Sequence, residues 1–406
     1  MKKMHKIIFW AITFFAFGFF PNSFAQTYPF PANVTYPFGF KATTITAADA
    51  QTAYNAWKTT YTEGCSDGSI RVRFDNAAET VSEGIGYGML MAAYTADSAL
   101  LNGLWKYYKR FPDANGLMNW KINGCTSATG YNAATDAELD AAMALLVMAK
   151  QFPNTTSPYT YLTEATWLIN KIKAHEVATT SSNLLVIKPG DVFGGETCTN
   201  SSYFAPAYYR AFAKTVTADS VFWNKLATDT YTSLVGNAHA TTGLNSDWQA
   251  ANGTAGGSCG SNYAFSGLRY SYDACRTPWR IGLDYLWWGT PQAKTQLDKM
   301  TDWVQNTLGG IQNVKDGYQQ DGTLTGQWHN SPFTGAFAVA AMAKDQSRTD
   351  TFGSDIKNIP AAADGYFGKT LRVLYLLTLT GNFWNPSTVA SPCVSSGCIE
   401  ATVHRN

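Results

Sequence analysis

An apolar helix is predicted to begin in the stretch Val81-Ser82-Glu83-Gly84-Ile85-Gly86-Tyr87-Gly88-Met89, where one carboxylate lies among small residues. Charged residues make up only 15% of the chain, so Glu83 stands out in this setting. The simplest explanation is a charge in the first helical turn, which the helix dipole favours. The three glycines allow a large group to approach the backbone closely. We interpret them as room for close packing or for an approaching ligand.

Helical spacing of apolar residues continues along the chain and predicts an all-α fold. The predicted helices are 46–62, 82–96, 97–111, 134–152, 157–177, 203–214, 218–236, 274–289, 291–308, 332–344, 349–358 and 364–380. Strand-like runs are few, namely residues 70–74 and 184–187. The sequence shows no internal repeat, which argues against a solenoid. A closed ring of helical hairpins is favoured because it buries the inner helices on all sides, and an open antiparallel stack is the alternative.

The N-terminus resembles a signal peptide. A basic start at residues 2–6 precedes an apolar run at 7–20, and Ser23-Phe24-Ala25 offers a cleavage site. About fourteen apolar residues are too few to span a bilayer easily. We therefore predict three parts and secretion to the extracellular space or periplasm. The parts are a signal peptide (1–25), a single large helical domain (26–384) and a tail containing Ser, Thr and Pro (385–406).

The charge balance is nearly neutral, with 30 Lys and Arg against 29 Asp and Glu. This argues against nucleic acid or an anionic membrane as a partner, because both require a basic surface. We expect a monomer that binds neither of these partners. Aromatic residues make up 14% of the chain and include 13 Trp and 22 Tyr, which suits a protein that stacks rings on sugars.

The cysteines and histidines give no metal or cofactor prediction. Six of the seven cysteines could form three disulfides in an oxidising compartment, and their pairing cannot be deduced from spacing. Cys393 and Cys398 are near enough to close a loop in the tail. The histidines are scattered. A Ser-hydrolase elbow and the Lys of a phosphate loop are both missing from the sequence.

Two further acids, Asp136 and Asp273, lie where long loops enter helices, as Glu83 does. Asp136 could be a helix cap, and Asp273 could form a structural ion pair with Arg276 one turn later. Long loops in a compact domain are usually functional, and in a helical ring they would gather at one end and form a groove. Two carboxyl groups flanking a glycosidic bond can hydrolyse it, one as acid and the other as base or nucleophile.

With these residues, the chain from about Tyr36 to Phe383 resembles glycoside hydrolase family 8. The matching segments are Ser82–Met89, Ala134-Thr135-Asp136-Ala137 and Tyr272-Asp273-Ala274-Cys275-Arg276. The resemblance implies that Glu83 is the general acid, that Asp273 is the base oriented by Arg276, and that Asp136 contacts the distorted sugar. The glycines after Glu83 are then interpreted as room for a sugar chain.

The resemblance also implies substrate contacts outside the acids. The residues expected to bind substrate are Trp120, Arg276, Tyr203, Phe193, Tyr366 and Tyr87. Taken without the resemblance, an aromatic residue is more often part of the core. The sequence departs from the family pattern at Glu138, Ala141 and Phe152, which stand where Asp, a larger aliphatic residue and Trp are usual.

The family fold is an (α/α)6 barrel of six inner and six outer helices, which agrees with the twelve predicted helices. Its members invert the anomeric centre, which requires the two carboxyl groups to lie about 6.5–9.5 Å apart. We therefore predict a secreted inverting endo-β-1,4-glucanase of the cellulase type, which acts on cellulose or related β-glucans without a cofactor. Three alternatives stay open: the same chemistry on xylan or mixed-linkage glucan, a non-catalytic glycan-binding protein, and a polysaccharide lyase.

Overall fold

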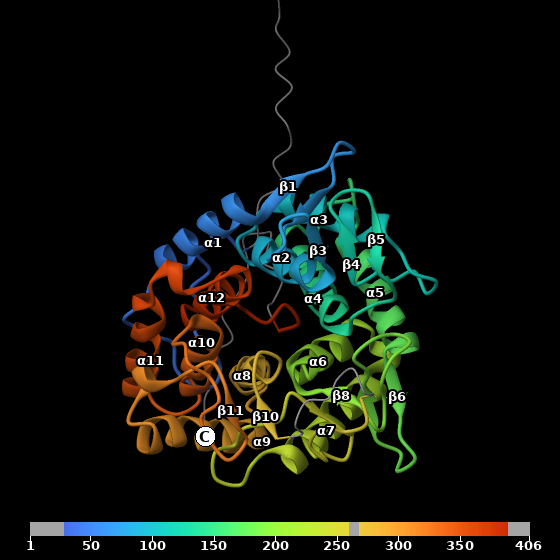
Figure 1. The fold of residues 1–406 in the computed structure, drawn as a ribbon. Helices are drawn as coiled ribbons and strands as arrows, with labels where there is room; N and C mark the ends of the chain where they lie inside the picture. The colour runs from blue at the N-terminus through green and yellow to red at the C-terminus, as the bar shows by residue number, and fades with distance from the viewer. Residues whose placement is uncertain (1–27, 260–267, 389–406) are drawn as a thin grey trace, which may run out of the picture.

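Helices form two concentric rings in the computed structural model, which describes residues 28–259 and 268–388 (Figure 1). The predicted signal peptide lies outside these residues, and so does most of the predicted tail, including Cys393 and Cys398. No helix in the described ranges is long and apolar enough to cross a membrane.

Twelve α-helices within the described ranges alternate between the outer and the inner ring. The outer helices are α1 (Ala47–Tyr61), α3 (Ser98–Arg110), α5 (Tyr161–His175), α7 (Ser220–Asn237), α9 (Pro291–Asp302) and α11 (Gln346–Asn358). The inner helices are α2 (Ser82–Tyr94), α4 (Thr135–Gln151), α6 (Pro206–Thr215), α8 (Thr277–Trp288), α10 (Ser331–Ala341) and α12 (Tyr366–Leu379). Because α12 packs against both α10 and α2, the ring is closed. The predicted (α/α)6 barrel is confirmed, and the open stack is wrong.

All twelve predicted helices are present, and their ends differ from prediction by a few residues. Proline occupies the first or second position of α6, α8, α9 and α10, where its missing N–H costs nothing. Short helical turns account for several shifted ends. These turns are η1 (Ser201–Tyr203), η2 (Thr217–Asp219), η4 (Ala274–Arg276), the π-helical η5 (Trp303–Thr307), η6 (Ile311–Asn313) and η7 (Ala361–Ala363).

The inner helices are buried over most of their surface. Every residue of α10 is buried, and Glu83 is the one residue of α2 that is not. A helix that is apolar all round requires such an environment. The outer helices expose one face, so the core lies within and between the rings.

The glycines of α2 mark close packing between protein segments. A Cβ on Gly84 would lie 2.3 Å from the Tyr366 hydroxyl, and one on Gly86 would lie 2.9 Å from the carbonyl oxygen of Ala137 in α4. All three glycines are buried. Their interpretation as room for a sugar chain is therefore wrong, because protein atoms already fill that space.

Short antiparallel strands occupy the connections that run from an outer to an inner helix. They are β1 (Thr62–Gly64), β2 (Ile70–Val72), β3 (Glu79–Val81), β4 (Lys121–Asn123), β5 (Ser127–Gly130), β6 (Val177–Thr179), β7 (Leu185–Ile187), β8 (Thr199–Asn200), β9 (Trp248–Gln249), β10 (Arg269–Tyr270) and β11 (Tyr318–Gln319). They pair as β1–β2, β3–β4–β5, β6–β7, β8–β9 and β10–β11. In register, Thr80 faces Ile122 and Tyr270 faces Tyr318. The two predicted strands are confirmed in shortened form, as β2 and β7.

Two disulfides fasten these connections together. Cys65 pairs with Cys125, which joins the turn after β1 to the turn after β4, and Cys198 pairs with Cys259 across the loops that precede α6 and α8. Cys275 is buried and free. Each disulfide closes a long loop, which typically contributes about 2–4 kcal/mol.

The contact between Gly86 and α4 predicts the cost of a methyl group there. Replacing Gly86 with Ala should destabilise the protein by about 1–3 kcal/mol, because the Cβ meets backbone that cannot rotate away. Chemical denaturation measures the change. Gly64→Ala is the matched control, since no atom lies within 4 Å of a Cβ at that position. Equal stability of the two variants would contradict this packing.

Candidate active site

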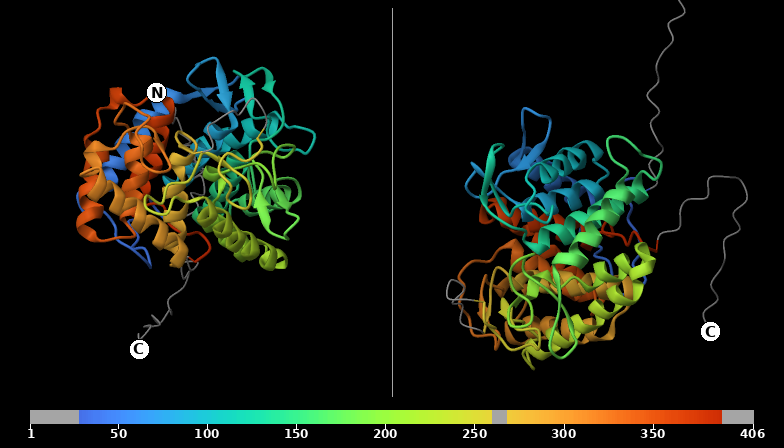
Figure 2. Two further views of the ribbon diagram at one scale, coloured as in Figure 1. Left: turned by 60° about the horizontal axis from the view of Figure 1, so that its bottom comes forward. Right: turned by 90° about the vertical axis from the view of Figure 1, so that its right-hand side faces the viewer.

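The six inner helices all begin at the same end of the barrel, because the chain passes alternately through the outer and inner rings. The strand-bearing connections gather at this end, which is the left-hand side of the barrel in the right-hand view of Figure 2. Glu83 and Asp136 are the second residues of α2 and α4, and Tyr366 is the first of α12. Tyr203 precedes α6, and Asp273 precedes η4 and α8. The topology therefore brings together residues that are far apart in sequence.

A single guanidinium group joins the three predicted acids. Arg276 Nη1 donates to Glu83 Oε2 at 2.7 Å and to Asp136 Oδ2 at 3.0 Å. Its Nη2 donates to Asp273 Oδ1 at 3.2 Å. The Tyr87 hydroxyl accepts a further hydrogen bond from Nη1 at 3.0 Å. With 3% of its side chain exposed, Arg276 lies at the centre of the cluster.

The cluster carries more negative than positive charge. Beneath it, Arg280 and Asp140 form a buried pair with two hydrogen bonds of 2.6 and 2.8 Å, so Arg280 is already neutralised by its own partner. Burial and the charges of the neighbouring carboxylates raise the pKa of Glu83 to about 8, although Arg276 opposes this. Burial also raises the pKa of Asp136. Glu83 therefore holds a proton at neutral pH.

Two of the three acids face a cavity of about 480 Å³. Glu83 and Asp273 line it, with 19% and 32% of their side chains exposed. Asp136 is 2% exposed and lies beneath, against Arg276. The aromatic rings of Phe74, Tyr272 and Phe367 complete the walls of this cavity. The arrangement presents one protonated and one further carboxyl group to the same space, which is what acid–base hydrolysis needs.

The predicted aromatic contacts occupy three kinds of position. Trp120 is 42% exposed, and its carbonyl oxygen accepts a hydrogen bond from the Ser82 amide, which places it beside the start of α2. Tyr203 is half-buried, with its ring 5.7 Å from the Arg276 guanidinium. Tyr87 and Tyr366 are buried behind the cluster.

Phe193 lies with the Cys198–Cys259 disulfide and Trp248, and its ring is 6.4 Å from the Trp248 ring. Phe193 therefore packs among the loops that precede α6 and α8, and it does not line the acid-lined cavity.

Sequence analysis missed Asp247, which lines the same cavity and is 4% exposed. Its Oδ1 accepts hydrogen bonds from the amides of Ser271 and Ala274, both at 2.8 Å, so it holds the backbone on either side of Asp273. Burial and the charge of Asp273 raise the pKa of Asp247 to about 7. No local pattern could have identified Asp247, because its partners lie more than twenty residues away in a different segment.

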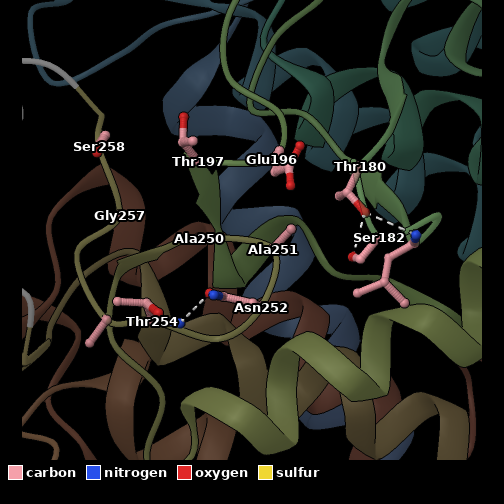
Figure 3. A pocket seen from close by; sticks show the side chains of 12 residues that line it. Thr180, Ser182, Glu196, Thr197, Ala250, Ala251, Asn252, Thr254, Gly257 and Ser258 are labelled. Carbon is pink, nitrogen blue, oxygen red and sulfur yellow. Dashed lines mark hydrogen bonds between the residues drawn. The ribbon is translucent and has the colours of Figure 1, made fainter.

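A separate pocket of about 340 Å³ lies between the β6–β7 turn and the loop that follows β9 (Figure 3). It is lined mainly by small side chains and hydroxyl groups, and none of the three acids reaches it. Its Glu196 carboxylate accepts a hydrogen bond from the Ser181 amide at 2.9 Å. This pocket lacks the aromatic faces of the acid-lined cavity, so we do not assign the reaction to it.

The helical barrel and its paired acids define a glycoside hydrolase, an enzyme that cleaves bonds between sugars. A model of the family described as glycosyl hydrolases family 8 matches residues 28–381. The chain belongs to that family.

Named relatives extend the comparison. The chain is 38% identical to Endoglucanase 2 of Ruminiclostridium josui over 90% of this chain and 79% of the relative. It also resembles the structure of a β-1,3-1,4-glucanase from Paenibacillus sp. X4, with 28% identity and a TM-score of 0.81 over 89% of this chain and all of the other. A family 8 xylobiose complex from Teredinibacter turnerae matches with 21% identity and a TM-score of 0.72, over 84% of this chain and 95% of the other, and this likeness shows the fold.

The contacts of Asp247 predict that it positions Asp273. Asp247→Ala leaves two buried amides without an acceptor and should lower kcat by about 10–100-fold, since small displacements of a catalytic group are costly. Asp247→Asn retains an oxygen acceptor and should recover most of that loss. Steady-state kinetics on a soluble β-glucan measures both.

The control for this prediction is Asp321→Ala, which removes an exposed acid that also accepts a backbone hydrogen bond, from Thr323 at 2.8 Å. It should leave kcat unchanged. An Asp247→Ala enzyme as active as the native protein would show that turnover does not depend on these two hydrogen bonds beside Asp273.

Proposed function

We propose that the protein is a secreted, inverting endo-β-1,4-glucanase that hydrolyses internal bonds of cellulose or related β-glucans. The observation that carries this proposal is that Glu83 and Asp273 face one cavity and share the Arg276 guanidinium. The endoglucanase names of relatives at 36–38% identity support the substrate.

In the proposed reaction, Asp273 removes a proton from a water molecule whose oxygen attacks the anomeric carbon. Glu83 gives its proton to the glycosidic oxygen as the bond between that oxygen and the anomeric carbon breaks. Attack from the face opposite the leaving group converts a β-linkage into an α-hemiacetal. Water then restores the proton to Glu83 and accepts the one held by Asp273.

The shared guanidinium sets an upper limit on the distance between the two carboxyl groups. Its two hydrogen bonds limit the bonded oxygens of Glu83 and Asp273 to a separation of at most about 8 Å. This limit admits both the spacing of about 6.5–9.5 Å in inverting enzymes and the shorter spacing in retaining ones, so inversion is proposed from membership of family 8. Arg276 holds the two carboxyl groups in place, and Asp136 supports Arg276 from beneath the cavity. Trp120 and Tyr203 offer ring faces to neighbouring sugars.

A mixed-linkage glucanase is the second candidate, favoured by the likeness to the Paenibacillus β-1,3-1,4-glucanase. The catalytic residues would be the same, because the two substrates differ only in the linkages beside the cleaved bond.

Export of the protein is part of the proposal. Its support is the basic and apolar N-terminus together with two disulfides, which persist in oxidising compartments. We propose a monomer with one catalytic domain at 26–384, flanked by the signal peptide and a short tail.

A substrate panel with acid variants tests the function. Reducing ends released from carboxymethylcellulose, mixed-linkage β-glucan and xylan should show that β-glucans are preferred. Glu83→Gln and Asp273→Asn should each fold normally and lose about 10²–10⁴-fold in kcat. Glu79→Gln is the matched control, because its carboxylate forms a partly exposed ion pair with Lys121 and should matter little.

Preference for xylan would reject the proposed substrate. Near-normal turnover by either acid variant would reject its assigned role, and binding of glucan without cleavage would indicate a glycan-binding protein.

The pH profile tests the identity of the general acid. Because the acid must be protonated, kcat/KM should fall tenfold per unit as pH rises above about 8, the raised pKa of Glu83. Asp136→Asn removes a negative charge that helps to raise this pKa, so the alkaline limb should move to lower pH. An alkaline limb that stays fixed in Asp136→Asn would argue that another group controls it.

A further inference from the structure

A second cavity of about 470 Å³ adjoins the acid-lined cavity, and the two share Arg269, Ser271 and Tyr272 as lining residues. Its far side is formed by the segments on either side of β11, with Asp316 before the strand and Trp328 after it. A chain that leaves the catalytic carboxyl groups past Tyr272 therefore enters this second cavity.

Two exposed aromatic rings line the second cavity. Trp328 is 69% exposed and Tyr272 is 42% exposed, whereas most large aromatic side chains of this protein are buried. Scattered exposed apolar residues are common on protein surfaces and need no function. Two large rings at the wall of one cavity, next to the catalytic acids, are a more specific arrangement.

The Asp316 carboxylate accepts hydrogen bonds from both aromatic residues, Tyr272 and Trp328. Asp316 Oδ1 accepts hydrogen bonds from the amides of Gln327 and Trp328 at 2.7 and 2.8 Å. Its Oδ2 accepts a hydrogen bond from the Tyr272 hydroxyl at 2.7 Å. One side chain therefore fixes the backbone that bears Trp328 and the ring of Tyr272.

The loop that bears Trp328 is also held by its own backbone. The amides of Thr325 and Gly326 both donate to the carbonyl oxygen of Gly317, at 3.0 and 2.9 Å. A Cβ on Gly326 would lie 2.4 Å from the Gly317 nitrogen, so the segments before and after β11 are in direct contact. The backbone next to the exposed Trp328 indole is therefore held in a defined conformation.

We propose that Trp328 forms a further sugar-binding position of the cleft, on the Tyr272 side of the catalytic acids, and that it binds a β-1,4-linked glucan chain beyond the cleavage point. The apolar face of a pyranose ring packs on the indole, and the hydroxyl groups at its rim stay in water. The proposal rests on the proposed function. It implies that long chains gain binding energy that short oligosaccharides cannot reach.

Cello-oligosaccharides of graded length test the proposal. Trp328→Ala should lower kcat/KM on cellohexaose about three- to tenfold more than on cellotriose, the size expected for loss of one ring contact. Trp328→Tyr retains a ring and should recover most of the length dependence. Phe38→Ala is the matched control: Phe38 is 42% exposed but contacts Gly289 after α8, at the opposite end of the barrel, so it should leave the ratio unchanged.

If Trp328→Ala leaves the ratio of kcat/KM on cellohexaose to kcat/KM on cellotriose unchanged, whether or not both values fall, the proposal is overturned. Failure of the proposed function is a separate outcome, seen as absence of cleavage by the native chain. In that case titration of cellohexaose and cellotriose into native and Trp328→Ala protein decides the inference by binding alone. Weaker binding of only the longer sugar in the variant supports it, and identical affinities overturn it.

Discussion

The Arg276 guanidinium is the interaction on which the rest of the site depends. Burying a cation is costly unless charged partners surround it. Three carboxyl groups do so here, and they exceed what one cation can neutralise. A bound proton removes part of the excess negative charge. Glu83 holds this proton because burial and its acidic neighbours raise its pKa to about 8. The residue that makes the cluster stable thus also leaves it with a proton to donate.

The barrel topology makes that interaction possible. Glu83, Asp136 and Arg276 lie on three different segments, and only the alternation of outer and inner helices brings their starts to one end. The positive ends of α2 and α4 both face the acids, which favours negative charge there. Contact between Gly86 and α4 lets these two helices approach closely enough for one guanidinium to reach both acids.

Local sequence pattern was sufficient to predict the helices. The outer helices carry apolar residues at helical spacing, and the inner helices are long, almost continuously apolar runs. The three acids were also predictable, since each stands at a boundary between loop and helix. What sequence could not supply depends on contacts between distant segments. Asp247 shows no pattern until its amide partners beside Asp273 are known. Strands of two or three residues are too short for alternation to be seen. The glycines of α2 were misinterpreted because a glycine indicates that some group approaches the backbone closely, but it does not tell whether that group belongs to the protein or to a ligand.

A raised pKa does not by itself identify the proton donor. Glu138 and Glu176 are completely buried, and burial raises the pKa of both well above the usual range, with the charge of Glu176 adding to the effect on Glu138. Neither has a cationic partner among the described hydrogen bonds and ion pairs; Glu138 accepts a bond from the Tyr108 hydroxyl. Both acids are enclosed in the core and line none of the cavities described above. Glu83 experiences the same physics, but it is the one residue of α2 that reaches the cavity. Access to the cavity, combined with a retained proton, is therefore what distinguishes Glu83, the proposed general acid, from these two buried acids.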